Sequence, residues 1–122
     1  NENDEEILKN LASKISKNLM LANDEKRKYI HLTAVFACNF VNHLYARAKE
    51  ISDSQGIPFD YFLPLIDETT QKIHELEPKL AQTGPAIRND EKVLKLHESL
   101  LTDEEKLKIY KTLNESIKKM YS

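Results

Sequence analysis

The sequence contains very few of the residues that break helices or cross-link chains. Its 122 residues include two glycines, four prolines, one cysteine and no tryptophan. A single cysteine excludes an internal disulfide, so we expect Cys38 to be a buried structural thiol in a reducing compartment and the protein to be cytoplasmic. No glycine-rich phosphate loop and no Gly-x-Ser-x-Gly nucleophile motif occurs.

The charges and apolar runs exclude several classes of partner. Eighteen basic and 20 acidic residues give a net charge of −2, so no basic field predicts binding to nucleic acid or to an anionic membrane. No apolar run reaches the roughly 18 residues of a membrane span, and the acidic start is unlike a signal peptide. The four histidines lie far apart without other ligands at zinc spacing, so no metal site is expected.

The longest uninterrupted helical pattern runs from Asp24 to about Ser54. It contains no Gly or Pro, and at about 1.5 Å per residue it would form a helix roughly 45 Å long. Asn23 or Asp24 can cap its start, and Gly56 suits a left-handed stop. Because Ile30–Ala48 is apolar almost all the way round, we expect neighbours to bury it on several sides. The sequence therefore predicts a mainly α domain built around this long central helix.

Polar side chains interrupt the apolar zone on one side of the expected helix. At about 100° per residue, His31, Asn39 and Asn42 fall on the side that also carries Cys38. A buried imidazole or amide without a partner costs on the order of 1–3 kcal/mol, so each needs a hydrogen bond. Loop backbones could supply these bonds, or the face could line a cleft where a ligand meets the domain. The residue pattern leaves both interpretations open.

A second helix is expected after Gly56. An apolar stripe recurs at helical spacing over Tyr61–Leu76, with Asp60 as a plausible cap. Pro64 is compatible with a helix only in the first turn, and the helix should end before Pro78. A short link then leads to the next segment.

Two more helices follow in the last third of the chain. Asn89 or Asp90 can cap a helix over 91–100, which carries apolar residues on one side. Thr102 and Glu105 form the capping box T-x-x-E, so the last helix should begin at about Asp103.

Two short elements precede the central helix. Asn3–Lys17 has the pattern of an amphipathic helix, and Asn18–Ala22 is typical of a short strand or of an extended connector. A lone strand has no partner in this chain, so a helix followed by a strand suggests the tail of an α/β unit whose remainder is absent. We therefore expect residues 1–22 to be that tail and residues 23–122 to be the helical domain.

The segment Thr83–Asp90, TGPAIRND, combines a turn with a charge at a helix start. Gly84-Pro85 is a strong turn signal, and the segment places Arg88 at the mouth of the next helix. A guanidinium beside the positive end of a helix dipole is suited to an anion. The alternative is a purely structural turn in which Arg88 pairs with Asp90 or a carbonyl.

Three of these stretches together carry a resemblance. The segments HLTAVFACNFVNHLYARA and GIPFDYFLPLIDETT, and TGPAIRND with His97 downstream, resemble a bacterial family of Rossmann-like oxidoreductases over roughly Ala22–Leu101. Its members join a nucleotide-binding domain to a C-terminal helical domain of unknown function. Their architecture is similar to that of 6-phosphogluconate dehydrogenase, pyrroline-5-carboxylate reductase and deazaflavin-dependent NADP oxidoreductases. The resemblance implies a 6-phosphogluconate dehydrogenase C-terminal-like fold, with residues 1–22 as the remnant of a Rossmann domain.

The resemblance also implies where a site would lie. In the related reductases the helical domain dimerises and closes the cleft over the nicotinamide. His31 would face that cleft as the candidate catalytic residue, because an imidazole can transfer a proton near neutral pH. Two departures stand out, since relatives commonly have Gly at the position of Asn89 and Ser at that of Cys38. The implied substrate-binding residues are Asn39, Asn42, Thr83, Gly84, Pro85, Arg88, Asp90 and His97.

We therefore predict the C-terminal substrate-side and dimerisation domain of an NAD(P)-dependent oxidoreductase. The absent Rossmann domain would bind NAD(P), the substrate would be a small molecule, and the protein would be a homodimer. The chain alone is expected to be inactive and to bind no dinucleotide, because it has no phosphate-cradling glycine loop. The alternative is a non-catalytic helical dimerisation module of a nucleotide-sensing Rossmann protein. A free-standing helical adaptor is a third possibility, which the isolated strand pattern of Asn18–Ala22 argues against.

Overall fold

The computed structural model describes residues 5, 6, 9 and 23–122. By its internal contacts the chain divides into two compact units, Asn1–Ile57 and Pro58–Ser122. All regular elements of the described residues are helical and none is a strand, so the predicted mainly α class is confirmed. Of the helix expected over Asn3–Lys17, the described residues Glu5, Glu6 and Lys9 are helical. The remainder of that stretch and the expected strand lie outside the described residues, and the boundary after residue 22 stays a prediction.

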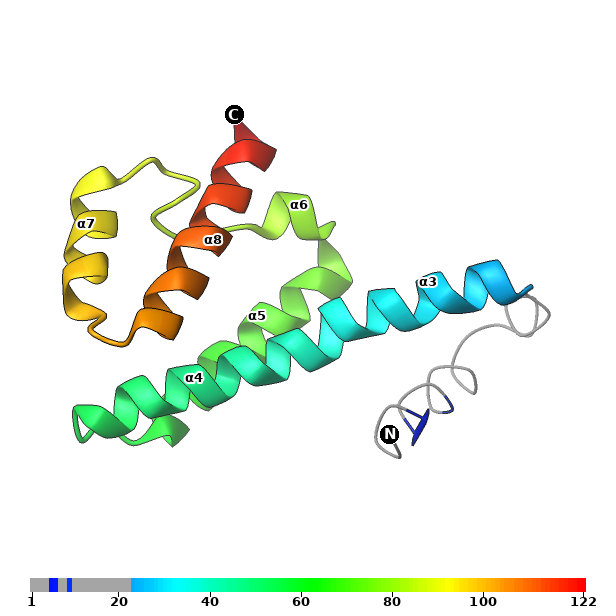
Figure 1. The fold of residues 1–122 in the computed structure, drawn as a ribbon, viewed down its shortest axis with the longest axis horizontal. Helices are drawn as coiled ribbons and strands as arrows, with labels where there is room; N and C mark the ends of the chain where they lie inside the picture. The colour runs from blue at the N-terminus through cyan, green and yellow to red at the C-terminus, as the bar shows by residue number, and fades with distance from the viewer. Residues whose placement is uncertain (1–4, 7–8, 10–22) are drawn as a thin grey trace. The chain divides into compact units, whose positions relative to one another are not determined.

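The first unit contains the central helix, and its bounds are those expected from the sequence. Helix α3 (Asp24–Ala34), a π-helical segment (Val35–Asn39) and helix α4 (Phe40–Ser54) follow one another without a break, as one rod in Figure 1. At the start, the Asn23 side-chain oxygen accepts a hydrogen bond from the Lys26 backbone N–H at 3.0 Å. Asn23 is therefore the N-cap.

The helix ends in the left-handed stop that Gly56 was expected to provide. Gly56 has φ +66°, a conformation that glycine adopts without steric cost. Its N–H donates to the Asp53 carbonyl at 3.1 Å, and the Ile57 N–H donates to the Ser52 carbonyl at 2.9 Å. These two bonds form a Schellman motif, which satisfies carbonyl groups that the helix end would otherwise leave free.

The expectation that neighbours bury the central helix on several sides is wrong. Only Ala34 and Ser52 are buried among residues 23–57, and the thiol of Cys38 is exposed. The described part of this unit is almost entirely the helix itself, so it supplies few side chains to cover an apolar surface. Large apolar side chains remain exposed along the helix at Tyr29, Leu32, Phe36, Phe40, Leu44 and Ile51.

The second unit opens with a short 3-10 turn, Phe59–Phe62, and helix α5 (Leu63–Glu75). Pro64 lies in the first turn of α5 as predicted, where its missing N–H costs no hydrogen bond. Asp60 is not the cap of this helix, because the 3-10 turn intervenes and α5 begins three residues later. The expected link after Pro78 is a single helical turn, α6 (Pro78–Ala81).

Helices α7 (Glu91–Leu100) and α8 (Glu104–Tyr121) complete the second unit and lie side by side in Figure 1. The capping box predicted for α8 is wrong in its register. Asp103 is the N-cap, and its carboxylate accepts from the Glu105 N–H at 2.9 Å. Glu105 is therefore the second residue of the helix, one position short of the third residue that a capping box requires.

Polar contacts of two tyrosines connect the helices of this unit. The Tyr110 hydroxyl on α8 lies 2.8 Å from Nδ1 of His97 on α7, with the two rings edge to face at 5.7 Å. The Tyr121 hydroxyl donates to the Lys79 carbonyl of α6 at 2.5 Å.

None of the described helices combines the length and the apolar content that a membrane crossing needs.

Candidate functional site

The three polar residues expected on one side of the central helix lie around its π-helical segment. His31 is in the last turn of α3, Asn39 ends the π segment, and Asn42 is in the first turn of α4. His31 and Asn39 are half-buried and Asn42 is exposed. π-Helical turns are rare and occur frequently at functional sites. Within the described part of the chain none of these three side chains makes a hydrogen bond, so the bonds to loop backbones considered above are not found there.

The predicted loop Thr83–Asp90 is held by its own backbone. Gly84 has φ +106°, so a side chain at this position would strain the turn. The Asp90 N–H donates to the Pro85 carbonyl at 2.9 Å, and the Asn89 N–H donates to the Ala86 carbonyl at 3.2 Å. Ala86 is buried at 3% exposure and anchors the loop, whereas Thr83 is exposed.

The conformation of Asn89 explains why glycine suits this position. Asn89 has φ +53° and is the one described non-glycine residue with positive φ. Asparagine tolerates this left-handed conformation better than most residues, although glycine adopts it at lower cost. The departure from Gly noted in the sequence therefore keeps the loop geometry.

Asp90 and Arg88 have different roles in this loop. The Asp90 carboxylate accepts from the Val93 N–H at 3.3 Å and is the N-cap of α7. The Arg88 side chain is exposed and forms no ion pair with another described residue. The pairing of Arg88 with Asp90 that a purely structural turn would use is therefore not formed, and the guanidinium stays accessible to an anion.

His97 lies in the interior of the second unit, on α7. It is half-buried, and its Nδ1 is paired with the Tyr110 hydroxyl. This contact gives His97 a structural role between two helices, because the polar atoms of a half-buried imidazole need a hydrogen-bond partner. His97 thus contacts α8, and its place behind the loop stays a prediction.

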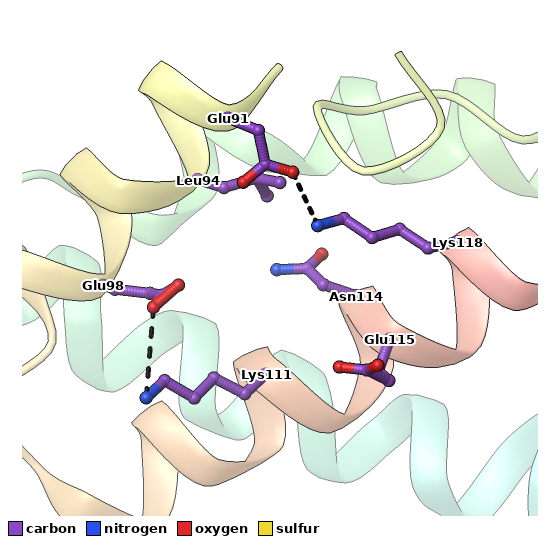
Figure 2. A pocket seen from close by; sticks show the side chains of 7 residues that line it. All are labelled: Glu91, Leu94, Glu98, Lys111, Asn114, Glu115 and Lys118. Atoms are coloured by element: carbon purple, nitrogen blue, oxygen red, sulfur yellow. Dashed lines mark hydrogen bonds and ion pairs between the residues drawn. The ribbon is translucent and has the colours of Figure 1, made fainter. Parts of the chain in front are cut away.

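Sequence reasoning missed a groove between α7 and α8, which Figure 2 shows from close by. Two ion pairs cross it: Glu91 to Lys118 at 2.8 Å and Glu98 to Lys111 at 4.0 Å. The groove has a volume of about 250 Å³ and is lined by Glu91, Leu94, Glu98, Lys111, Asn114, Glu115 and Lys118. The signal for it is the helical spacing of these residues, three on one helix and four on the other, but nothing in the sequence pairs the two helices.

The Glu91–Lys118 ion pair shifts the pKa of both of its members. The hydrogen bond from Lys118, followed by the attraction of its charge, lowers the pKa of Glu91 below its usual 4.5. The same hydrogen bond raises the pKa of Lys118 above 10.5. The Glu91–Lys118 ion pair therefore joins the two helices across the groove. Among the described residues no group of three His, Cys, Asp or Glu side chains could hold a metal ion.

The nine predicted site residues fall into two groups, one in each unit. His31, Asn39 and Asn42 belong to the first unit. The loop 83–90 and His97 belong to the second. Within each unit the structure brings the members of the group together on one helix segment, or on one loop and the helix that follows it. That both groups contribute to one site stays a prediction.

The residues of this chain do not fit the phosphates of a dinucleotide. A Rossmann domain cradles the pyrophosphate with a glycine-rich turn between a strand and a helix. The two glycines of this chain are Gly56 at a helix end and Gly84 in the loop, 28 positions apart in the sequence. The chain therefore does not supply that cradle.

One family model and one solved structure match this chain. The family described as Domain of unknown function (DUF2520) matches residues 1–117. The crystal structure of the "putative NADP oxidoreductase BF3122 from Bacteroides fragilis" is similar to this chain, with 54% sequence identity and a TM-score of 0.78. The match covers 80% of this chain but only 38% of that protein. A search of curated proteins finds no match.

Proposed function

This chain belongs to the DUF2520 family, and on that premise we propose that it is the C-terminal substrate-side and dimerisation domain of an NAD(P)-dependent oxidoreductase. The observation that carries the proposal is the 54% identity to part of a protein described as an NADP oxidoreductase. The match covers 38% of that protein, and the remainder is long enough to contain a nucleotide-binding domain. This chain does not replace such a domain, because it has no glycine-rich turn for the dinucleotide phosphates. A cytoplasmic location is part of the proposal.

The accessible polar groups suggest a division of roles on the substrate side. His31 would hold or move a proton at the reacting oxygen or nitrogen, since an imidazole titrates near neutral pH. Asn39 and Asn42 would orient the substrate through their amides. The guanidinium of Arg88, which is exposed and makes no ion pair with another described residue, would bind a carboxylate or phosphate of the substrate. Thr83, Gly84, Pro85 and Asp90 would shape the loop, with His97 behind it.

The test uses a longer protein in which the nucleotide-binding domain precedes these residues. Oxidation of NADPH is followed by absorbance with a panel of small carbonyl and imine compounds. Replacement His31→Asn should lower the rate by about 10²-fold or more, as expected for loss of a general acid or base. His43→Asn, a change at an exposed histidine of α4, is the matched control and should leave the rate unchanged. Equal rates for both variants would contradict the role of His31.

A second candidate function is the non-catalytic dimerisation module of a nucleotide sensor. It is favoured by the finding that no described residue makes a hydrogen bond that would orient the His31 ring. A sensor would bind NADPH without consuming it in the presence of any compound of the panel. An oxidoreductase would consume it with at least one.

A further inference from the structure

The exposed apolar side chains of the central helix form a single surface, which we call the aromatic stripe: Tyr29, Leu32, Phe36, Phe40, Leu44 and Ile51. Their exposed fractions range from 37% at Leu44 to 66% at Tyr29. Phe36 and Phe40, at the middle of the helix, form an edge-to-face pair with ring centroids 5.0 Å apart. No Asp, Glu, Lys or Arg occurs between Tyr29 and Ala46, although 31% of the whole chain is charged. Depletion of charge and enrichment in aromatic residues are typical of interface cores.

The π-helical segment helps to keep this stripe in line. Leu32, Phe36, Phe40 and Leu44 recur every four residues. In a regular α-helix four residues overshoot a full turn by about 40°, so such a row would wind away around the helix. The π segment Val35–Asn39 closes a wider turn, which advances less per residue and takes up part of that overshoot. The row therefore stays closer to one face than its spacing alone would allow.

We propose that the aromatic stripe is the surface on which a second copy of this chain docks, with the two central helices antiparallel about a twofold axis near Cys38. This inference rests on the dimerisation role proposed above and assigns it to particular residues. A twofold interface must be self-complementary, since each residue meets the same surface of the partner. Phe36 and Phe40 lie at equal sequence distances on either side of residue 38, and so do Leu32 and Leu44. The antiparallel arrangement therefore sets aromatic against aromatic and leucine against leucine at the four central positions. The outer members Tyr29 and Ile51 lie opposite Arg47 and Glu25 at the rim.

The area of the stripe fits a dimer. Aromatic side chains offer roughly 150–250 Å² each when fully accessible and Leu or Ile side chains less, so six that are about half exposed present on the order of 500 Å². Two such surfaces would bury about 1,000 Å², which is about the least that a specific interface needs. A single monomer seldom exposes a larger apolar patch without using it.

The stripe and the polar residues His31 and Asn42 lie on different sides of the helix. At about 100° per residue, Cys38 is turned by roughly 160° from both Phe36 and Phe40, toward the side of His31 and Asn42. Asn39 is turned only about 20° from Leu32 and lies at the edge of the stripe. A partner docked on the stripe therefore leaves His31 and Asn42 open to substrate and lies beside Asn39. The exposed thiol of Cys38 should also remain reactive in the dimer.

Sedimentation equilibrium of the 122-residue chain tests the assignment. The wild-type chain should have twice its monomer mass of 14.2 kDa. The double variant Phe36→Glu/Phe40→Glu should associate at least about a hundredfold more weakly, since it places charges at the interface centre. The control Tyr61→Glu/Leu80→Glu changes two apolar side chains that are equally or more exposed in the other unit, and should remain dimeric. Alkylation of Cys38 should also leave the dimer intact.

The outcomes separate this inference from the proposed function. A wild-type chain that stays monomeric at all concentrations would contradict both the dimerisation role and the stripe. A double variant that remains dimeric would contradict only the stripe, and if its melting temperature also fell, the stripe would be covered within one chain. A monomeric double variant with unchanged circular dichroism would support the assignment.

Crosslinking tests the register even if the double variant does not fold. Leu32→Cys and Leu44→Cys chains are prepared with Cys38→Ser and mixed with a bismaleimide that reaches about 10 Å, the usual distance between packed helices. The mixture should give crosslinked dimers. The Leu32→Cys chain alone should give none, since two copies of residue 32 would lie about 18 Å apart along the axis. Crosslinking of the Leu32→Cys chain to itself, or none in the mixture, would overturn the antiparallel arrangement.

Discussion

Single residues set the geometry of the loop that leads into α7. Asn89 holds a left-handed conformation and Asp90 caps the helix through the Val93 N–H, so the chain turns sharply just after Arg88. The backbone of Arg88 consequently lies just before a fixed helix start, and its exposed side chain makes no ion pair with another described residue. The loop thus exposes the charge of Arg88, while the neighbouring Asp90 carboxylate accepts the hydrogen bond of the Val93 N–H.

Substitution of Asn89 measures how much this conformation costs. Asn89→Val should lower the free energy of unfolding by about 1–2 kcal/mol, because a β-branched residue is strongly disfavoured at positive φ. Asn89→Gly should leave stability equal or slightly higher. Urea unfolding followed by circular dichroism gives both values. Equal losses for Val and Gly would show that the Asn89 side chain, rather than its backbone angle, is what matters.

The residue scale is also where sequence reasoning performed best. Asn23, Gly56 and Pro64 take the positions assigned to them because each acts through local backbone chemistry that neighbouring sequence fixes. The N-cap of α8 was assigned wrongly, because two neighbouring residues can both cap this helix. Thr102 with Glu105 matches a capping box, yet the Asp103 carboxylate is an equally good cap one residue later.

At the scale of elements, α7 and α8 are joined by charges as well as by packing. The Glu91–Lys118 and Glu98–Lys111 pairs span the groove of Figure 2, and the His97–Tyr110 contact lies between the same two helices. Exposed ion pairs are individually weak, but a hydrogen-bonded pair adds a dependence on pH.

The stability of the α7–α8 pair should therefore fall in acid in a way that Glu91 controls. Its pKa is lowered in the folded chain by the Lys118 hydrogen bond, so the contribution is present above the ordinary value of 4.5 and is lost as pH falls through the lower folded value. Melting temperatures of Glu91→Gln and wild type should differ at neutral pH and converge as the pH falls below 4.5. The control Glu68→Gln, on an exposed α5 carboxylate, should track wild type throughout.

One result would contradict the role given to the Glu91–Lys118 ion pair. A constant difference between wild type and Glu91→Gln from neutral pH to acid would mean that packing, not the ion pair, accounts for the effect. High salt should also shrink the difference at neutral pH, since the pair is exposed.

Most elements could be predicted because helix periodicity is strong and Gly and Pro are rare. The central helix ends at the residue expected, and four helical stretches occur in the order expected. The π segment at Val35–Asn39 could not be foreseen, since its sequence VFACN carries no Gly or Pro and reads as ordinary helix. The α7–α8 groove was missed for a different reason, because periodicity identifies a face without saying which helix it meets.

At the scale of the whole molecule, the apolar pattern of the central helix was interpreted incorrectly. An all-round apolar helix implies that something covers it, and we assumed that this chain supplied the cover. Phe36 and Phe40 are instead exposed, and our proposal is that a second copy of the chain covers them. The sequence suggested His31, Asn39 and Asn42 as site residues by their position on that helix, and their role stays a prediction because composition alone could not assign one. The family relation supplies the context that single residues lack.

The central claim is that this chain serves an NAD(P)-dependent oxidoreductase as its substrate-side domain. The most direct measurement is NADPH binding by calorimetry, with this chain beside a longer protein in which a Rossmann-like domain precedes it. Only the longer protein should bind, because this chain has no glycine cradle for the dinucleotide phosphates. Failure of the longer protein to bind NADPH, or tight binding by this chain alone, would contradict the account.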